Sequence, residues 1–180
     1  MELRYAVKFK RGFDFVRGGK LPGLAGGTAP TGTTRATGTN GFAARMMWLT
    51  SHTGQPGAPK QKTTHAISYS KFVGSGYDGD GKDEDETDFS SNGKLTVLTS
   101  NKWYDIKQRV KMNDPSKSNG FIKIWVNGTL VVNQTNIRFR TSNAFAIDKV
   151  YFGTFFGGGS SWRTSKYETA YFDNFVVKAL

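Results

Sequence analysis

Apolar residues recur at every second position over much of the chain, which is the spacing of half-buried β-strands. The period is clear in residues 3–9, 105–112, 149–156 and 168–177. Gly, Asn, Ser and Thr separate these runs, and stretches with the 3.6-residue period of a helix are nearly absent. The pattern therefore predicts many short strands joined by turns.

For one pair of strands, the sequence also predicts the type of the connecting turn. Residues 121–126 (FIKIWV) and 129–132 (TLVV) flank the dipeptide Asn127-Gly128. Asn-Gly favours the type I′ turn, in which both central residues need positive φ. We predict a β-hairpin here.

Strands of this number and length favour an all-β fold, an antiparallel β-sandwich or jelly roll. Residues 26–41 and 51–64 are rich in Gly, Thr or Pro and are expected to be long surface loops. Because no internal repeat or linker interrupts the pattern, we expect residues 1–180 to form a single domain.

The composition excludes several classes of structural and catalytic site. The chain has 180 residues, of which 37% are hydrophobic and 14% aromatic, enough for a sizeable core. It has no cysteine, which excludes disulfides, thiolate metal sites and cysteine nucleophiles. His52 and His65 are its only histidines, so a three-histidine zinc site is excluded. No apolar stretch is long enough for a transmembrane helix.

Charge narrows the choice of partner. Lys and Arg number 25 against 14 Asp and Glu, for a net charge of +11. Such a basic chain favours a polyanion: nucleic acid, an anionic membrane surface or an acidic polysaccharide. We expect neither nucleic acid nor membrane as partner, since the sequence has no recognition helix, phosphate-binding glycine loop or aromatic block typical of RNA-binding domains.

Five blocks of the sequence together resemble one enzyme family. They are RYAVKFKRGFDFVRGGKLPGLAGG (4–27), GFAARMMW (41–48), WYDIKQRVKMN (103–113), NGFIKIWVNG (119–128) and FGTFFGGGSSW…TAYFDNFVV (152–177). In this order they are similar to polysaccharide lyase family 14 and its glucuronan-lyase relatives.

The resemblance implies a β-jelly roll with a concave cleft that cleaves alginate or glucuronan, both polyuronates, by β-elimination, without a cofactor. It also implies a secreted protein, and we expect a monomer. Family members carry strand-forming sequence before the block that opens this chain, so the chain is expected to lack N-terminal family sequence.

Elimination from a uronate sets its own chemical demands. The C6 carboxylate must be neutralised, since the C5 proton is otherwise too weakly acidic to remove. A base must then take that proton, and an acid must protonate the leaving oxygen at C4. Lys, Arg and Tyr can fill these roles.

The resemblance places two of these groups directly. Lys20 follows the paired glycines at the position of the family's essential lysine. Arg45 matches the arginine of a Ser-x-Arg recognition motif, although the serine position is Ala43 here. An arginine suits a carboxylate because two parallel hydrogen bonds can form.

Tyr69 is the third candidate catalytic residue. The family's Tyr-x-Tyr corresponds to Ile67 and Tyr69, so only the second tyrosine is kept. Period two places His65 on the same face of the strand. Three alternatives remain: Tyr69 suffices with Lys20, His65 takes up a role, or activity is weakened.

Further residues are candidates for substrate binding. Lys107, Arg109 and Lys111 form a one-sided basic stripe, which on the concave sheet would be a polyanion groove and on the convex sheet a solvated face. Gln108 matches a polar family position. The remaining candidates are His65, Trp162, which could stack on a sugar ring, and Tyr171.

The acidic run at 78–88 invites a calcium hypothesis, with Asp78, Asp80 and Asp83 as ligands. Position 5 of an EF-hand loop starting at Asp78 would be a lysine, so the pattern fails. We expect a solvated acidic loop and no metal.

Two other functions stay open at this point. The departures at Ala43 and Ile67 allow a non-catalytic carbohydrate-binding module of the same fold. Charge alone allows a nucleic-acid-binding domain as the third alternative. We predict the lyase.

Overall fold

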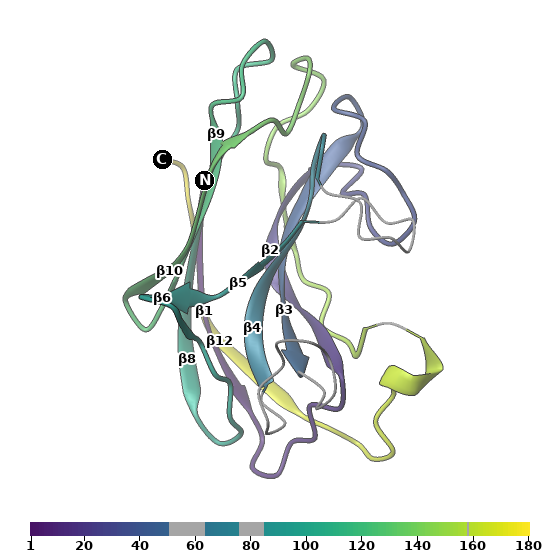
Figure 1. The fold of residues 1–180 in the computed structure, drawn as a ribbon, viewed down its shortest axis with the longest axis vertical. Coiled ribbons are helices and arrows are strands. Elements are labelled where there is room, and N and C mark those ends of the chain that lie inside the picture. Colours follow the sequence, from purple (N-terminus) through teal and green to yellow (C-terminus); the bar gives the residue numbers. More distant parts are fainter. Residues whose placement is uncertain (51–63, 76–84, 158) are drawn as a thin grey trace.

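Two antiparallel sheets packed face to face make up the protein (Figure 1). The computed structural model describes residues 1–50, 64–75, 85–157 and 159–180. Within these residues the first sheet has the strand order β10 (Thr129–Ile137), β9 (Gly120–Val126), β8 (Trp103–Lys111), β1 (Glu2–Phe9), β12 (Ala170–Lys178). The predicted all-β sandwich is confirmed.

The second sheet has the order β11 (Lys149–Tyr151), β2 (Gly18–Gly27), β3 (Gly41–Thr50), β4 (Thr64–Lys71), β5 (Asp85–Asp88). A small ladder of β6 (Ser90–Ser91) and β7 (Lys94–Leu95) and the 3₁₀ turn η1 (Ser160–Trp162) complete the described elements. None of the helical structure in the described part of the chain is long and apolar enough to cross a membrane.

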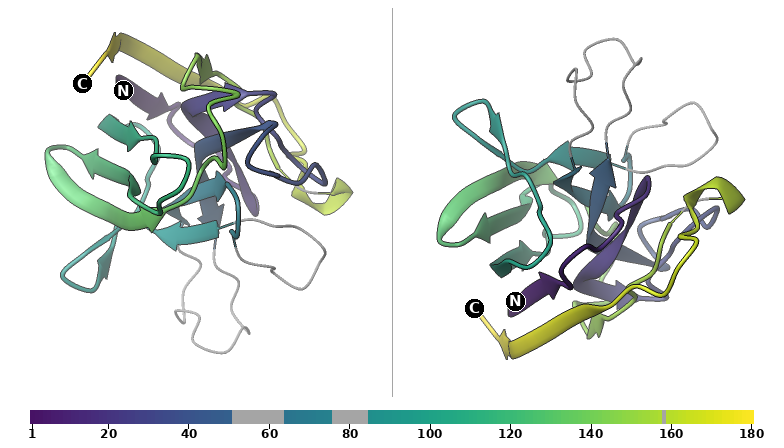
Figure 2. Two further views of the ribbon diagram at one scale, coloured as in Figure 1. Left: turned by 90° about the horizontal axis from the view of Figure 1, so that it is seen from above. Right: turned by 90° about the horizontal axis from the view of Figure 1, so that it is seen from below.

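The core lies between the two sheets, which Figure 2 shows from above and from below. Alternate residues of β1, from Leu3 to Phe9, point into it and are almost fully buried. Phe42, Met46 and Trp48 of β3 meet them from the other sheet. The period-two pattern therefore assigns inner and outer faces correctly on both sheets.

Gln108 spans this core rather than facing a ligand. Its Oε1 accepts a hydrogen bond of 2.9 Å from Leu24 N–H, and its Nε2 donates one of 2.8 Å to the Ala44 carbonyl. The side chain is fully buried on β8 and reaches both β2 and β3. Our prediction that Gln108 binds substrate is wrong, because both ends of its amide are occupied inside the sandwich.

The turn at Asn127-Gly128 forms as predicted, with φ of 49° and 82° at the two residues. The run at 149–156 is shorter than predicted, because β11 ends at Tyr151. Tyr151 pairs with Gly23, and the next position on β2 is Pro22, which has no N–H to extend the ladder. Beyond that point the chain leaves the sheet.

Candidate active site

Lys20, Arg45 and Tyr69 meet on the outer face of the second sheet, from the neighbouring strands β2, β3 and β4. Arg45 lies directly opposite Tyr69 in the ladder. Lys20 lies opposite Met47, which is two residues along β3 on the same face. Sequence positions far apart are thus brought to one place by strand pairing.

Glycines at the start of β2 let it lie against bulky side chains. A Cβ on Gly19 would lie 2.1 Å from the Trp48 ring and 2.6 Å from the Phe155 carbonyl oxygen. The next residue is held from the same side, since Lys20 N–H donates a hydrogen bond of 2.8 Å to that carbonyl. The paired glycines therefore fix the backbone that carries Lys20.

The three side chains are in direct contact with aromatic and sulfur groups. Lys20 Nζ lies 2.9 Å from the centre of the Tyr69 ring and 3.1 Å from Met47 Sδ. The Arg45 guanidinium carbon lies 5.5 Å from the Tyr69 ring centre and 5.1 Å from that of Tyr151. All three predicted catalytic residues are buried. In so little water, a contact between one of these cations and an anion is stronger than the same contact in bulk solvent.

Two residues of this face were not predicted. The Tyr151 ring centre lies 5.1 Å from the Arg45 guanidinium carbon, and β11 and β4, which carry Tyr151 and Tyr69, are on opposite sides of β3 in the strand order. Lys71 of β4 is buried opposite Ala43, and its ammonium donates a hydrogen bond to the Gly32 carbonyl of the loop between β2 and β3. Period two from Tyr69 would have placed Lys71 on this face, whereas Tyr151 depends on pairing that the sequence does not reveal.

The two departures from the family motifs are filled by apolar packing. Ala43 packs with Ala25 and Ala29. Ile67, which occupies the position of the first tyrosine in the family's Tyr-x-Tyr motif, packs with Met47 and Tyr69. Neither position offers a proton donor, so proton transfer here depends on the remaining groups.

His65 and Trp162 lie at the edge of the same face. His65 is buried on β4, in line with Ile67 and Tyr69 and opposite Leu49. Trp162, half-buried in η1, packs on the cluster of Met47, Ile67 and Tyr69. Both residues lie close to the three candidate catalytic residues, and their contact with substrate stays a prediction.

The basic stripe lies on the other sheet, away from the candidate active site. Lys107, Arg109 and Lys111 project from the outer face of the first sheet, since the alternate residues of β8 point into the core. Tyr171 of β12 also projects there, 43% exposed, with Lys8 Nζ 5.6 Å from its ring centre. Of the alternatives left open for these four residues, the structure excludes a face shared with Lys20, because the outer faces of the two sheets point in opposite directions.

No group of three or more His, Asp or Glu within the described ranges could hold a metal ion. The calcium hypothesis on Asp78, Asp80 and Asp83 falls outside the described residues.

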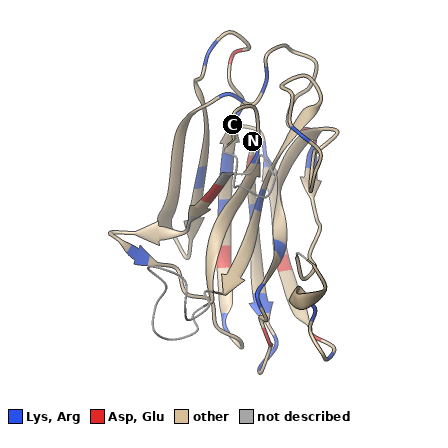
Figure 3. Cartoon of the chain, turned by 45° about the vertical axis from the view of Figure 1, so that its right-hand side comes forward, with Lys and Arg blue, Asp and Glu red and all other residues tan. Residues whose placement is uncertain are grey.

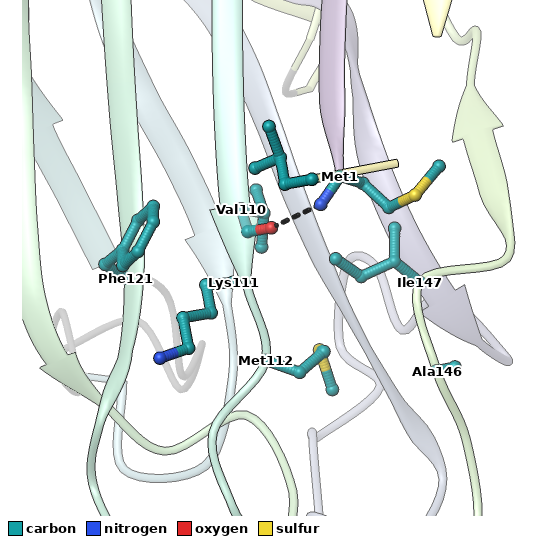
Figure 4. Close-up of a pocket in the computed structure, with 8 residues that line it drawn as sticks. Met1, Val110, Lys111, Met112, Phe121, Ala146 and Ile147 are labelled. Carbon is teal, nitrogen blue, oxygen red and sulfur yellow. Dashed lines mark hydrogen bonds between the residues drawn. The ribbon is translucent and has the colours of Figure 1, made fainter. Parts of the chain in front are cut away.

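A cavity of about 560 Å³ opens at one end of the sandwich (Figure 4). Its lining includes Met1, Met112, Phe121 and Ile147, and the amino group of Met1 donates a hydrogen bond to the Val110 carbonyl. One lysine and otherwise apolar side chains make it unsuitable for an acidic polymer. The outer face of the second sheet is therefore the candidate active site.

Comparison with known proteins identifies a matching family. The family model described as Polysaccharide lyase 14 matches residues 1–175. No curated protein matches the sequence.

Solved structures give the same fold. Alginate lyase Aly36B is 26% identical with a TM-score of 0.74, over 97% of this chain and 67% of that one. A variant of Aly36B in complex with an alginate trisaccharide is 25% identical with a TM-score of 0.77, over 97% and 68%. The PL-14 alginate lyase of Aplysia kurodai is 25% identical with a TM-score of 0.63, over 97% and 67%. The chain thus spans about two thirds of the length of these enzymes.

Proposed function

The chain belongs to polysaccharide lyase family 14, and we propose that it cleaves an acidic polyuronate, alginate first among them, by β-elimination. The observation that carries the proposal is the buried contact of Lys20, Arg45 and Tyr69 on one sheet face. The alginate lyases with the same fold support the choice of polymer. Glucuronan is the alternative substrate.

Arg45 is the group suited to the C6 carboxylate. Its guanidinium can donate two parallel hydrogen bonds to a carboxylate, and Tyr69 and Tyr151 on either side restrict its movement. Pairing the carboxylate with a fixed cation stabilises the negative charge that develops when the C5 proton leaves. Arg45 therefore acts on both the bound substrate and the carbanion-like transition state.

Lys20 and Tyr69 are the groups suited to proton transfer. One of them, in its neutral or phenolate form, takes the C5 proton. The C5–H electron pair then forms the C4=C5 double bond, and the C4–O4 bond breaks. A proton from Lys20 or Tyr69 goes to the leaving O4. Both groups can serve one substrate because Lys20 Nζ lies against the face of the Tyr69 ring.

The rival function is a carbohydrate-binding module, which the apolar residues Ala43 and Ile67 favour. Ultraviolet absorbance of the new C4=C5 double bond separates the two. The protein is incubated in turn with alginate, polymannuronate, polyguluronate and glucuronan. Rising absorbance with one of them supports the proposal, and binding without any absorbance supports the module.

A further inference from the structure

The outer face of the first sheet, opposite the candidate active site, carries a dense group of cations. We call it the basic face and define it as Arg4 of β1, Lys107, Arg109 and Lys111 of β8, and Lys123 of β9. Bands of Lys and Arg on neighbouring strands can be followed in Figure 3. Asp105 and Asp173, both level with Ala6 of β1, end the basic face on one side.

Like charges face one another across the strands of the basic face. Arg4 is directly opposite Lys107, and Arg109 is directly opposite Lys123. Directly opposed like charges destabilise a sheet. In the described part of the chain, Lys107, Lys111 and Lys123 have no acidic side chain within ion-pair distance. The arrangement costs stability, and a bound polyanion would offset that cost.

One carboxylate already binds there. Glu2 is buried between Arg4, whose Nε lies 2.6 Å from its Oε1, and Arg109, which pairs with its other oxygen. The two arginines keep 45% and 40% of their side-chain surfaces exposed. The basic face thus has an internal example of the carboxylate binding that a uronate would require.

Aromatic rings position the cations. Lys107 Nζ lies 4.1 Å and the Arg109 guanidinium carbon 5.4 Å from the ring centre of Trp125. Lys123 Nζ lies 5.2 Å from that of Phe121. Cation–π contacts of this kind hold long side chains in place and reduce the entropy lost when a ligand binds.

We propose that the basic face is a second, non-catalytic binding surface for an acidic polysaccharide chain. The choice of polymer rests on the proposed function, since the enzyme would meet that polymer as its substrate. The face is an open sheet surface that extends over three strands, which suits an extended chain with repeated carboxylates. Binding at two faces raises the effective concentration of the polymer at the active site.

A nucleic acid fits the basic face less well. Single strands bind by stacking bases on open aromatic rings. The Trp125 ring is instead approached by Lys107 and Arg109, and Phe121 by Lys123. Because cationic side chains lie over these rings, little ring surface remains on which bases could stack.

The test reverses the three lysines of the basic face together: Lys107→Glu, Lys111→Glu and Lys123→Glu. The matched control reverses three exposed lysines elsewhere: Lys10→Glu, Lys94→Glu and Lys102→Glu. Both variants also carry Lys20→Ala to prevent cleavage, and their affinity for long-chain alginate is measured by calorimetry. We expect the basic-face variant to bind on the order of 10-fold more weakly than the Lys20→Ala parent, and the control to bind within about 3-fold of it.

Equal weakening in both variants, no weakening in either, or no binding by the parent would overturn the proposal. So would displacement of alginate by single-stranded DNA at equal charge concentration. With Lys20 intact, the lysine reversals should leave cleavage of an alginate trisaccharide unchanged. Failure of the proposed function would appear separately, as the absence of unsaturated product with the unsubstituted protein. In that case, weaker polymer binding by the basic-face variant alone would still support the basic face as a binding surface.

Discussion

At the residue scale, the candidate site contains two tyrosines around one arginine, and only one contacts Lys20. Tyr69→Phe removes the phenolic proton and keeps the ring against Lys20 and Ile67. We expect kcat to fall on the order of 10²-fold or more with little change in substrate binding. Steady-state kinetics on alginate measures the effect.

Tyr151→Phe is the matched control, because it makes the same change on the other side of Arg45. Most of the turnover should remain. If the control loses turnover and Tyr69→Phe keeps it, Tyr151 is the proton-transferring residue, and our assignment of Tyr69 is wrong.

The role proposed for Arg45 depends on the planar geometry of its guanidinium as well as on its positive charge. Arg45→Lys keeps the positive charge but loses the two parallel hydrogen bonds. We expect KM to rise and kcat to fall, with kcat/KM lower on the order of 10-fold or more, because the carboxylate is bound in both ground and transition states. A variant with unchanged kinetic constants would place the carboxylate elsewhere, with Lys71 as the next cation to replace.

At the element scale, period two predicted which residues of each strand share a face. Ala43, Arg45 and Met47 point outward and Phe42, Ala44 and Met46 inward, as the alternation requires. The pattern could not tell which outer face of the sandwich a strand contributes to. That depends on strand order, and it is why the sequence left open on which sheet the basic stripe of β8 lies.

The link between the sheets at Gln108 gives a prediction for stability. Gln108→Leu would leave Leu24 N–H and the Ala44 carbonyl without their partner inside the core. Each unpaired buried group costs about 1–3 kcal/mol, so the two together are expected to lower the free energy of unfolding by about 2–6 kcal/mol. Urea denaturation measures it. An unchanged midpoint would mean that the amide contributes little to holding the sheets together.

The pairing of β1 with β8 should depend on pH. Burial would raise the pKa of Glu2, but hydrogen bonds from Arg109 and Arg4 outweigh it and hold the pKa below its ordinary value of 4.5. A lowered pKa means that Glu2 stabilises the fold fully above about pH 4.5, and that this stability is lost as the pH falls through the folded-state pKa.

Glu2→Gln should therefore be less stable than the parent at neutral pH. The difference between the two in free energy of unfolding should shrink in acid. Chemical denaturation at several pH values checks this, and a difference that stays constant down to about pH 2 would contradict the role given to Glu2.

At the scale of the whole molecule, composition predicted a polyanionic partner but not how the charge is divided. A net charge of +11 is the same wherever the cations lie. In the structure Lys20, Arg45 and Lys71 are buried on one outer face, while Lys107, Arg109 and Lys111 lie on the other. The family motifs located the first group because they name individual positions. The second could be located only from the strand order.

This division predicts two different responses to salt. Exposed charges are screened over about 10 Å at 0.1 M salt, whereas buried charges are screened much less. Affinity for long-chain alginate, which can reach the exposed cations, should fall steeply as ionic strength rises. The kcat for a trisaccharide bound at Lys20, Arg45 and Tyr69 should change little, because those side chains are buried. Kinetics and calorimetry over a salt series test both. If polymer affinity stays flat between low and high salt, the exposed cations do not attract the substrate, whatever their number.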